Sequence, residues 1–296
     1  MRTMNRRTFI SSGIATTTLL ASAKSRANFA SPSAADGDRR VSPIGLQLYT
    51  VRNMMKTDFA GTLAKVAAVG YKEVEMAGYF AHPAKEVRAM LDQNGLISPS
   101  SHIDYKIIEE FLPAAIERAH IMGQTFLICP SIDDAQRKEP DGYKRAAELF
   151  NRAGGECQKA GIQFGYHNHT AEFTPSEALG ATLPYDYLLQ NTDPKLVCME
   201  MDLCWITVAG QDPVNYFAKY PARFPLVHVK DWQGQGGTTA DEAQRMRNVG
   251  QGSIDFKRIF AHSPQAGTKH YIVENDAAKT IDDIQVSYKY LNDLRF

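Results

Sequence analysis

Four side chains that could bind a metal ion stand at the ends of four apolar segments in the second half of the chain. They are His167, Asp202, His228 and Glu274, in GIQFGYHNH, LVCMEMDLCW, FPLVHVKDW and HYIVEND. Side chains at the carboxyl ends of parallel neighbouring strands can meet although they are far apart in sequence. Two imidazoles and two carboxylates combine nitrogen and oxygen donors, which suit Mn²⁺ first, and also Zn²⁺, Co²⁺ or Fe²⁺, better than Mg²⁺ or Ca²⁺. The residues therefore predict a site for one divalent cation or for acid–base chemistry.

Such a site suggests removal of a proton next to a carbonyl of a sugar or polyol derivative. A cation that chelates the carbonyl and a neighbouring hydroxyl would stabilise the enediolate charge as the proton leaves. Glu274 is the expected base, and His169 or Lys230 would exchange protons with oxygen. Isomerisation, epimerisation and β-elimination all pass through this intermediate, so the residues alone do not separate the three reactions.

Several nearby polar residues have both a chemical and a structural interpretation. Side chains alternate between the two faces of a strand, so Glu200 points the same way as Asp202 but lies deeper, where it would orient a ligand rather than bind the metal. Lys230 is either a proton donor or an ion-pair partner, and either His167 or His169 could be a core histidine. The residues that could bind sugar hydroxyls or a sugar face, or simply fill the barrel mouth and its loops, are Tyr49, Glu75, His102 and Trp232.

The elements that must position these residues alternate regularly from residue 43 onward. Short apolar or β-branched runs are separated by longer segments in which apolar residues recur every three or four positions, which is typical of amphipathic helices. Eight such units over about 255 residues predict an α/β fold, a (β/α)₈ TIM barrel. A doubly wound open sheet would need a Gly-rich turn after an early strand, and LQLYTVR has none. The expected strands are Ile44–Tyr49, Tyr71–Met76, Leu96–His102, Thr125–Cys129, Ile162–His167, Leu196–Asp202, Pro225–Lys230 and His270–Glu274.

With these elements in place, the sequence resembles the xylose isomerase-like TIM-barrel superfamily of sugar phosphate isomerases and epimerases. The stretches that carry the resemblance are YKEVEMAGY, GYHNHTAEF, MEMDLCW, GQDPVNYFAKYPARFPLVHVKDW, VGQGSIDFKRIF and YIVEND. The resemblance implies one divalent metal held by Glu, Asp, His and Glu from the last four strands, and Asp202, His228 and Glu274 match the last three. His167 stands where many members have Glu. Because the two metal-bound glutamates of such ketose epimerases also move the protons, this departure argues against a symmetric two-base epimerisation.

The first 30 residues have a composition of their own. Arg2, Arg6 and Arg7 precede an apolar, hydroxyl-rich stretch, and no acidic residue occurs before Asp36. The hexapeptide NRRTFI resembles a twin-arginine export signal, which directs folded proteins across the membrane. The apolar stretch is too short and too rich in Ser and Thr to span a bilayer. We therefore expect a signal peptide at 1–30, a linker at 31–42 and a catalytic barrel at 43–296 that is exported to the periplasm.

Charge and location restrict the partners and substrates. The chain has 33 basic and 33 acidic residues, which leaves no cationic field for a nucleic acid backbone. A periplasmic enzyme is expected to act on a small sugar rather than on a phosphorylated one, and a homodimer is compatible with the sequence. The expected function is an isomerase or epimerase. The alternatives are a lyase or hydratase that acts on 3-keto-glycosides by β-elimination, and a non-catalytic periplasmic sugar-binding protein.

Overall fold

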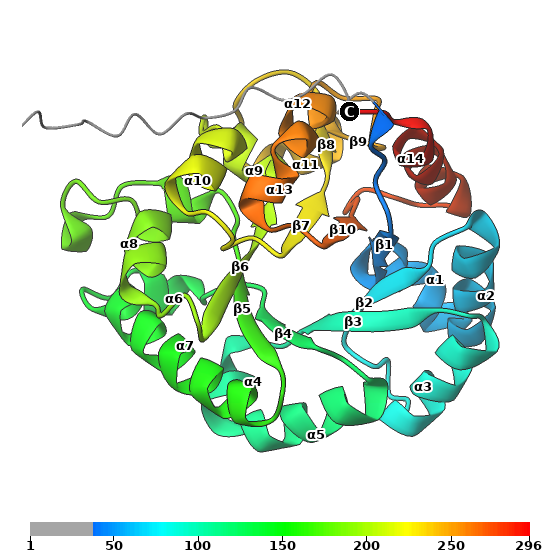
Figure 1. Cartoon of the computed structure of the whole chain (residues 1–296), viewed down its shortest axis with the longest axis horizontal. Helices are drawn as coiled ribbons and strands as arrows, with labels where there is room; N and C mark the ends of the chain where they lie inside the picture. The colour runs from blue at the N-terminus through cyan, green and yellow to red at the C-terminus, as the bar shows by residue number, and fades with distance from the viewer. Residues whose placement is uncertain (1–37) are drawn as a thin grey trace, which may run out of the picture. The chain divides into compact units, whose positions relative to one another are not determined.

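The barrel predicted from the sequence is confirmed. The computed structural model describes residues 38–296, so the expected signal peptide and residues 31–37 of the expected linker lie outside the described residues. Eight parallel strands close into a barrel in the order β1-β10-β7-β6-β5-β4-β3-β2 (Figure 1). They are β1 (Ile44–Gln47), β2 (Glu73–Ala77), β3 (Ile97–His102), β4 (Phe126–Cys129), β5 (Gln163–His167), β6 (Val197–Asp202), β7 (Leu226–Val229) and β10 (His270–Val273). Each strand falls within one of the expected runs or overlaps it.

The strands form because their residues are buried on both faces of the sheet. In β6, Val197, Met199 and Met201 belong to the main apolar core, which they share with residues of the helices. The alternate residues, Glu200 and Asp202 among them, face the barrel interior. A separate apolar cluster fills part of that interior and consists of Phe126, Ile128, Cys198, Leu226 and Ile272. Glu200 and Asp202 lie in the carboxyl-terminal half of β6.

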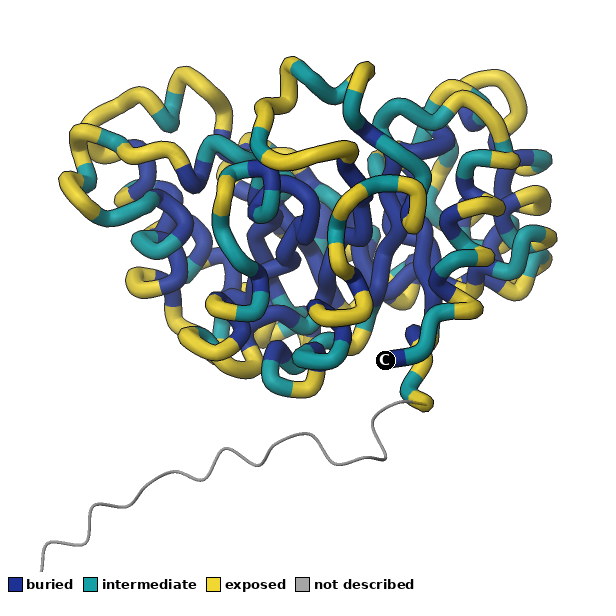
Figure 2. Tube along the Cα trace, turned by 90° about the horizontal axis from the view of Figure 1, so that it is seen from above, coloured by how far each residue is buried: buried dark blue, intermediate teal, exposed yellow. Residues whose placement is uncertain are grey.

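Helices surround the barrel and cover the outer faces of its strands (Figure 1). In α2, Phe59, Leu63 and Val66 recur at helical spacing and are buried, and Gly70 with a φ of 124° ends the helix. Figure 2 shows the buried residues in the middle of the molecule and the exposed residues on the outer turns. The helices are α1 (Arg52–Thr57), α2 (Phe59–Val69), α3 (Ala84–Gln93), α4 (Tyr105–Glu110), α5 (Leu112–Met122), α6 (Asp134–Arg137), α7 (Gly142–Lys159), α8 (Pro184–Asn191), α9 (Leu203–Val208), α10 (Pro213–Lys219), α12 (Phe256–Ala261), α13 (Ser263–Ala266) and α14 (Ile281–Asp293). Within residues 38–296, no helix has the length and apolarity needed to cross a membrane.

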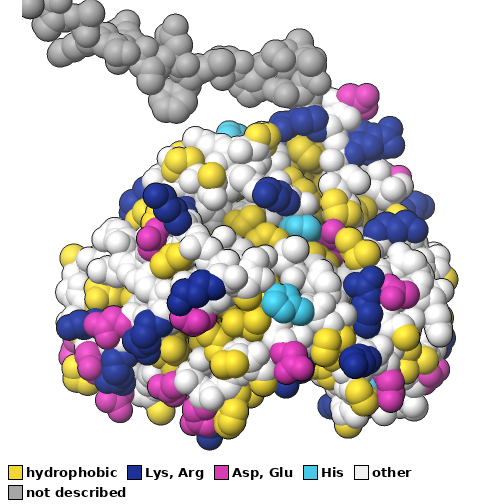
Figure 3. Space-filling view, turned by 60° about the horizontal axis from the view of Figure 1, so that its bottom comes forward, with side chains coloured by type: hydrophobic (Ala, Val, Ile, Leu, Met, Phe, Trp, Pro, Cys, Tyr) yellow, Lys and Arg dark blue, Asp and Glu magenta, His cyan; other side chains and the backbone are white. Residues whose placement is uncertain are grey.

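Charged side chains of both signs are mixed on the surface. On the face shown in Figure 3, Lys and Arg side chains lie among Asp and Glu side chains and do not merge into one basic patch. This mixture agrees with the equal numbers of basic and acidic residues in the chain. The described part of the chain therefore presents no broad cationic groove on this face.

The segment from Asp231 to Ile254, which we call the lid, has a fixed root. It contains β8 (Asp231–Trp232) paired antiparallel with β9 (Met246–Arg247), the turn η5 (Thr239–Asp241) and the short helix α11 (Glu242–Arg245). The Asp231 carboxylate accepts hydrogen bonds from the backbone N–H groups of Gly250, Gly252 and Ile254, at 2.8, 2.8 and 3.3 Å. A Cβ atom on Gly252 would lie 2.1 Å from Asp231 Oδ1, so this close approach requires glycine.

Candidate metal centre

The structure brings the four donors expected from the sequence together at the carboxyl ends of neighbouring strands. One donor atom each from His167, Asp202, His228 and Glu274 lies within 4.8 Å of the others, and all four residues are buried. His167 Nε2 lies 3.7 Å from Asp202 Oδ2, and His228 Nδ1 lies 2.7 Å from Glu274 Oε2. Strand register explains the convergence, because Asp202 pairs with His228 across β6 and β7. His167 ends β5, and Glu274 directly follows β10.

Asp202 shows how the local fold prepares one of these donors. Its Oδ1 accepts hydrogen bonds from the backbone N–H groups of Cys204 and Trp205, both at 2.9 Å, and so caps the first turn of α9. Its Oδ2 is buried and accepts no hydrogen bond, although Lys230 Nζ lies 3.3 Å away. A buried carboxylate oxygen without a hydrogen bond is unfavourable, and a cation beside it would remove that cost. This oxygen and the mixed donor set fit a divalent metal ion.

A second polar layer lies beneath the four donors. Glu200 Oε2 contacts three imidazole nitrogens: His102 Nε2 at 2.7 Å, His167 Nδ1 at 3.1 Å and His228 Nε2 at 3.2 Å. These separations are hydrogen-bond lengths. Because Nδ1 of His167 is bonded to Glu200, Nε2 is the nitrogen turned toward Asp202. Glu200 thus orients imidazole rings from below, which agrees with its deeper place on β6.

Glu75 belongs to this lower layer and does not line the barrel mouth. Its Oε2 lies 2.7 Å from His228 Nε2 and accepts a hydrogen bond of 2.7 Å from the Gln47 side chain. The side chain is fully buried. The expectation that Glu75 binds sugar hydroxyls is therefore corrected. Glu75 is buried beneath the mouth and contacts His228 instead. His102, from the same group of expected sugar-binding residues, does reach the mouth and remains partly exposed there.

Burial and neighbouring charges decide which imidazoles carry protons. Burial, with a smaller effect of His228, lowers the pKa of His167 well below its usual range, so His167 is neutral and has a lone pair to donate. Burial alone would also lower the pKa of His228, but the carboxylates of Glu200 and Glu274 outweigh it and raise the pKa well above the usual range. A cation that binds His228 would displace this proton.

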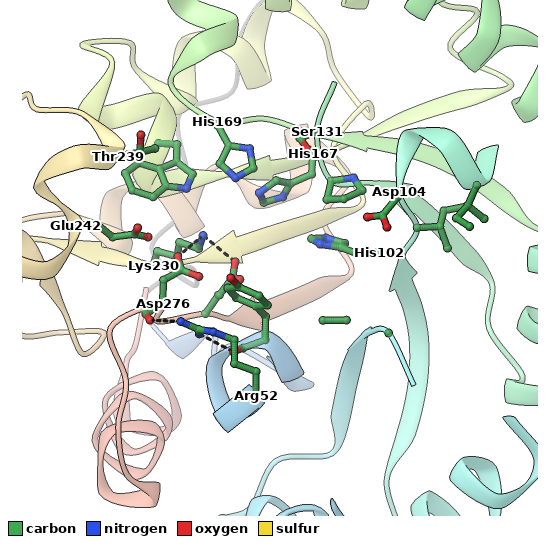
Figure 4. A pocket seen from close by; sticks show the side chains of 18 of the residues that line it. Arg52, His102, Asp104, Ser131, His167, His169, Lys230, Thr239, Glu242 and Asp276 are labelled. Carbon is green, nitrogen blue, oxygen red and sulfur yellow. Dashed lines mark hydrogen bonds and ion pairs between the residues drawn. The ribbon is translucent and has the colours of Figure 1, made fainter. Parts of the chain in front are cut away.

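Lys230 joins the four donors to the loop that follows β10. Its Nζ lies 2.8 Å from Glu274 Oε2, 2.9 Å from Asp276 Oδ2 and 3.3 Å from Asp202 Oδ2. Figure 4 shows Lys230 beside Asp276. Burial alone would lower the pKa of Lys230, but Asp276, Glu274 and Asp202 outweigh it and raise the pKa well above its usual range. Lys230 is therefore a permanent cation that neutralises buried carboxylates, as in the ion-pair interpretation of the sequence. It also lines the cavity described next.

A cavity of about 690 Å³ opens above the donors. Of the four, His167 and Glu274 line it, whereas Asp202 and His228 do not. Several other residues that the sequence singled out line it as well, and they are Tyr49, His102, His169 and Lys230 (Figure 4). The cavity is also lined by residues that the sequence analysis did not single out, among them Arg52, Trp205, Glu242 and Asp276.

Two rings at the cavity have distinct environments. Tyr49 stands at the mouth with 45% of its surface exposed, and the Arg52 guanidinium lies 4.0 Å over its ring. His169 lies deeper, and burial together with Lys230 lowers its pKa to about 3. His169 is therefore a neutral imidazole that can form hydrogen bonds in the cavity, while Tyr49 offers a flat ring at the entrance.

Trp205 forms an aromatic wall of the cavity. The expectation that Trp232 contacts a sugar face is corrected, because Trp232 does not line the cavity. Trp205 lines the cavity, and its ring centroid lies 6.3 Å from that of His169. Trp232 packs behind it at 5.5 Å, is buried, and donates its indole N–H to the Gly236 carbonyl. The Trp205 indole nitrogen is buried without a hydrogen-bond partner. Its position three residues after Asp202, at the barrel mouth, is the signal that could have identified it.

A comparison with known families agrees with this fold. The profile of the family described as "Xylose isomerase-like TIM barrel" matches residues 63–290, which include all four donors. The chain belongs to the xylose isomerase-like TIM barrel family.

Relatives within this barrel family carry names from two reaction classes. An inosose dehydratase of Lacticaseibacillus casei is 25% identical over 257 residues, covering 75% of this chain and 84% of the relative. An inosose dehydratase of Geobacillus kaustophilus is 27% identical over 231 residues, covering 67% and 73%. A crystal structure named as a sugar phosphate isomerase/epimerase from Parabacteroides distasonis is 28% identical, with a TM-score of 0.70 and coverage of 90% of this chain and 98% of that one. Family membership therefore places the barrel among enzymes that include both dehydratases and isomerases.

Added Mn²⁺ is expected to stabilise this barrel, and the Asp202→Asn substitution is expected to remove the effect. At a metal concentration 100 times the dissociation constant, the gain in unfolding free energy would be about 2.7 kcal/mol. Asparagine can still cap α9 with its carbonyl oxygen but has no anionic oxygen for a cation. Thermal melts with and without Mn²⁺ measure the gain. Asp212→Asn, which alters the cap of α10 near the surface, should keep the full response, and an equal response in both variants would contradict the site.

Proposed function

We propose that this barrel is a metal-dependent lyase that eliminates the group β to a carbonyl of a keto-sugar or keto-cyclitol. The observation that carries the proposal is the asymmetry of the four donors. Glu274 is the one carboxylate among them that lines the cavity, and the other donor that lines it is the imidazole of His167. One carboxylate base suits the removal of one proton followed by loss of a leaving group. The inosose dehydratase relatives support the same reaction class.

Isomerisation or epimerisation, the function expected first from the sequence, has weaker support. It rests on family membership and on the similarity to a structure named as a sugar phosphate isomerase/epimerase. A two-base epimerisation needs a second proton carrier on the opposite face of the reacting carbon. Both nitrogens of His167 are engaged, since Nδ1 bonds Glu200 and Nε2 faces Asp202. His167, the other donor that lines the cavity, is therefore poorly suited to carry a proton.

Different residues of the site would carry out different steps of the elimination. A divalent cation held by His167, Asp202, His228 and Glu274 would supply Lewis-acid stabilisation of the charge on the carbonyl oxygen. Glu274 turns Oε2 toward His228 and Lys230. Among the described residues its Oε1 has no hydrogen bond or ion pair, so Oε1 can accept the proton next to the carbonyl. The N–H of the neutral His169 and the Lys230 ammonium can donate hydrogen bonds to substrate oxygens.

Deuterium exchange coupled to product analysis tests the proposal. The protein with Mn²⁺ is incubated in D₂O with inosose and, separately, with methyl 3-keto-glucoside, and the products are identified by NMR and by the absorption of an unsaturated ketone. We expect the unsaturated ketone as product, and deuterium next to the carbonyl in substrate that is reprotonated before the leaving group departs. An epimer or isomer as the sole product would replace the lyase by an isomerase. A complete lack of both product and exchange with both compounds would favour a non-catalytic sugar-binding barrel.

A further inference from the structure

A second cavity adjoins the first at the root of the lid. Its volume is about 580 Å³, and it shares the lining residues Arg52, Glu242 and Asp276 with the first cavity. The rest of its wall is rich in amide and cationic side chains, namely Asn53, Arg247, Asn248, Gln251, Asn275 and Lys279. Amide groups both donate and accept hydrogen bonds, which suits a ligand that carries several hydroxyl groups. The two cavities thus adjoin at Arg52, Glu242 and Asp276, and we call these three residues the junction.

Glu242 stands at this junction with a proton to donate. It is the first residue of α11 on the lid, and its carboxyl group is hydrogen-bonded to that of Asp276. Two carboxyl groups in such contact share one proton. Lys230 Nζ lies 2.9 Å from Asp276 Oδ2, so this lysine and Glu242 both contact the Asp276 carboxylate. Burial and this hydrogen bond raise the pKa of Glu242 to about 7. Figure 4 shows Glu242 and Asp276 on the same side of the cavity as Lys230.

We propose that the second cavity binds the leaving group of the substrate, a hydroxylated group such as a second sugar, and that Glu242 protonates the departing oxygen. The inference rests on the proposed lyase function and extends it to the substrate class. A substrate that occupies both cavities has its scissile bond at the junction, where Arg52, Glu242 and Asp276 line both sides. The preferred substrates are therefore keto-glycosides with a sugar leaving group rather than free keto-cyclitols.

The proton and electron balance of this step is closed. Glu274 takes the proton next to the carbonyl, and the C–H electron pair becomes the enolate double bond. When the carbonyl re-forms, the electron pair of the β C–O bond leaves with the oxygen, and Glu242 transfers its proton to that oxygen. The products are an unsaturated ketone and an alcohol. Glu274 then releases its proton to water and Glu242 regains one from water, so both residues return to their starting states and no oxidant or reductant is needed.

The substitution Glu242→Gln separates acid chemistry from lid structure. The glutamine amide can still donate a hydrogen bond to Asp276, so the lid keeps its contact, but it cannot transfer a proton. With methyl 3-keto-glucoside, whose methanol leaving group needs protonation, we expect the elimination rate to fall by roughly 10²–10⁴-fold. With the nitrophenyl 3-keto-glucoside, whose leaving group departs as an anion, the fall should be far smaller. Equal losses with both substrates would show a structural role and overturn the assignment of Glu242.

The substitution Gln251→Trp tests the second cavity by filling it. Gln251 lines this cavity and is exposed, so tryptophan there should narrow the cavity without disturbing the core. We expect kcat/KM for a 3-keto-disaccharide to fall by roughly tenfold or more relative to that for the methyl glycoside. Gln244→Trp, an exposed lid position that lines neither cavity, is the matched control and should leave the ratio unchanged. An unchanged ratio in Gln251→Trp would overturn the leaving-group site. Failure of the wild-type protein to eliminate from any substrate would instead overturn the lyase function itself.

Discussion

Replacing Lys230 by methionine is expected to lower the unfolding free energy of the metal-free protein by about 3–5 kcal/mol. The ammonium is almost fully buried and contacts Asp202, Glu274 and Asp276 at 2.8–3.3 Å. Methionine preserves the length and volume of the side chain but removes the charge. Three carboxylates would then face one another without their common cation, and the cost of uncompensated buried charge exceeds that of the lost contacts.

Lys219→Met is the matched control for this prediction. Lys219 also forms an ion pair, with Asp186 at 2.6 Å, but its side chain is 53% exposed. An exposed ion pair contributes about 0–1 kcal/mol, so this substitution should change stability little. Denaturant unfolding of both variants without metal measures the difference. Adding Asp276→Asn to Lys230→Met should recover part of the loss, and similar losses in the two lysine variants would contradict the account of the buried charge cluster.

The four donors can be predicted from the sequence because a parallel barrel brings the carboxyl ends of all its strands to one rim. Parity along a strand then gives direction and depth, which is why Glu200 could be placed beneath Asp202. It is harder to predict from the sequence how deep residues on different strands lie relative to one another. Glu75 and His102 both stand near the ends of early strands, yet Glu75 is fully buried under His228 while His102 reaches the cavity. Only the register between distant strands and the packing of the imidazole rings separates the two.

The residues of the loops could not be predicted by the same reasoning. Their side chains follow no period of two or of 3.6 residues, so the sequence does not show which way they point. Trp232 lies close after β7 and was the aromatic candidate, but β8 turns it inward and Trp205 forms the wall. Glu242 reaches the cavity because the Asp231 carboxylate fixes the root of the lid. The root of the lid is held by hydrogen bonds from backbone N–H groups, and such bonds leave no pattern in the sequence.

Replacing Glu274 by glutamine is expected to reduce the elimination rate by about 10³-fold or more, because removal of a general base alone costs roughly 10²–10⁴-fold. Glutamine has nearly the same shape, so the contacts with His228 and Lys230 change in charge more than in position. The variant loses the oxygen that accepts the proton and one anionic donor of the metal site. Steady-state kinetics with methyl 3-keto-glucoside and Mn²⁺ measure the loss, and deuterium exchange shows whether proton removal is the step affected.

Glu73→Gln provides a control with the same kind of interaction away from the chemistry. Glu73 is buried and lies 2.8 Å from His270 Nδ1, much as Glu274 lies 2.7 Å from His228 Nδ1. Glu73 begins β2 and His270 begins β10, so this pair is at the opposite end of the barrel from the four donors. Its loss should weaken the fold without removing a group that touches substrate, so the rate per folded molecule should stay near that of the wild type. If both substitutions abolish turnover equally, the effect of Glu274→Gln is a loss of structure, and the base must be sought among the other residues that line the cavity.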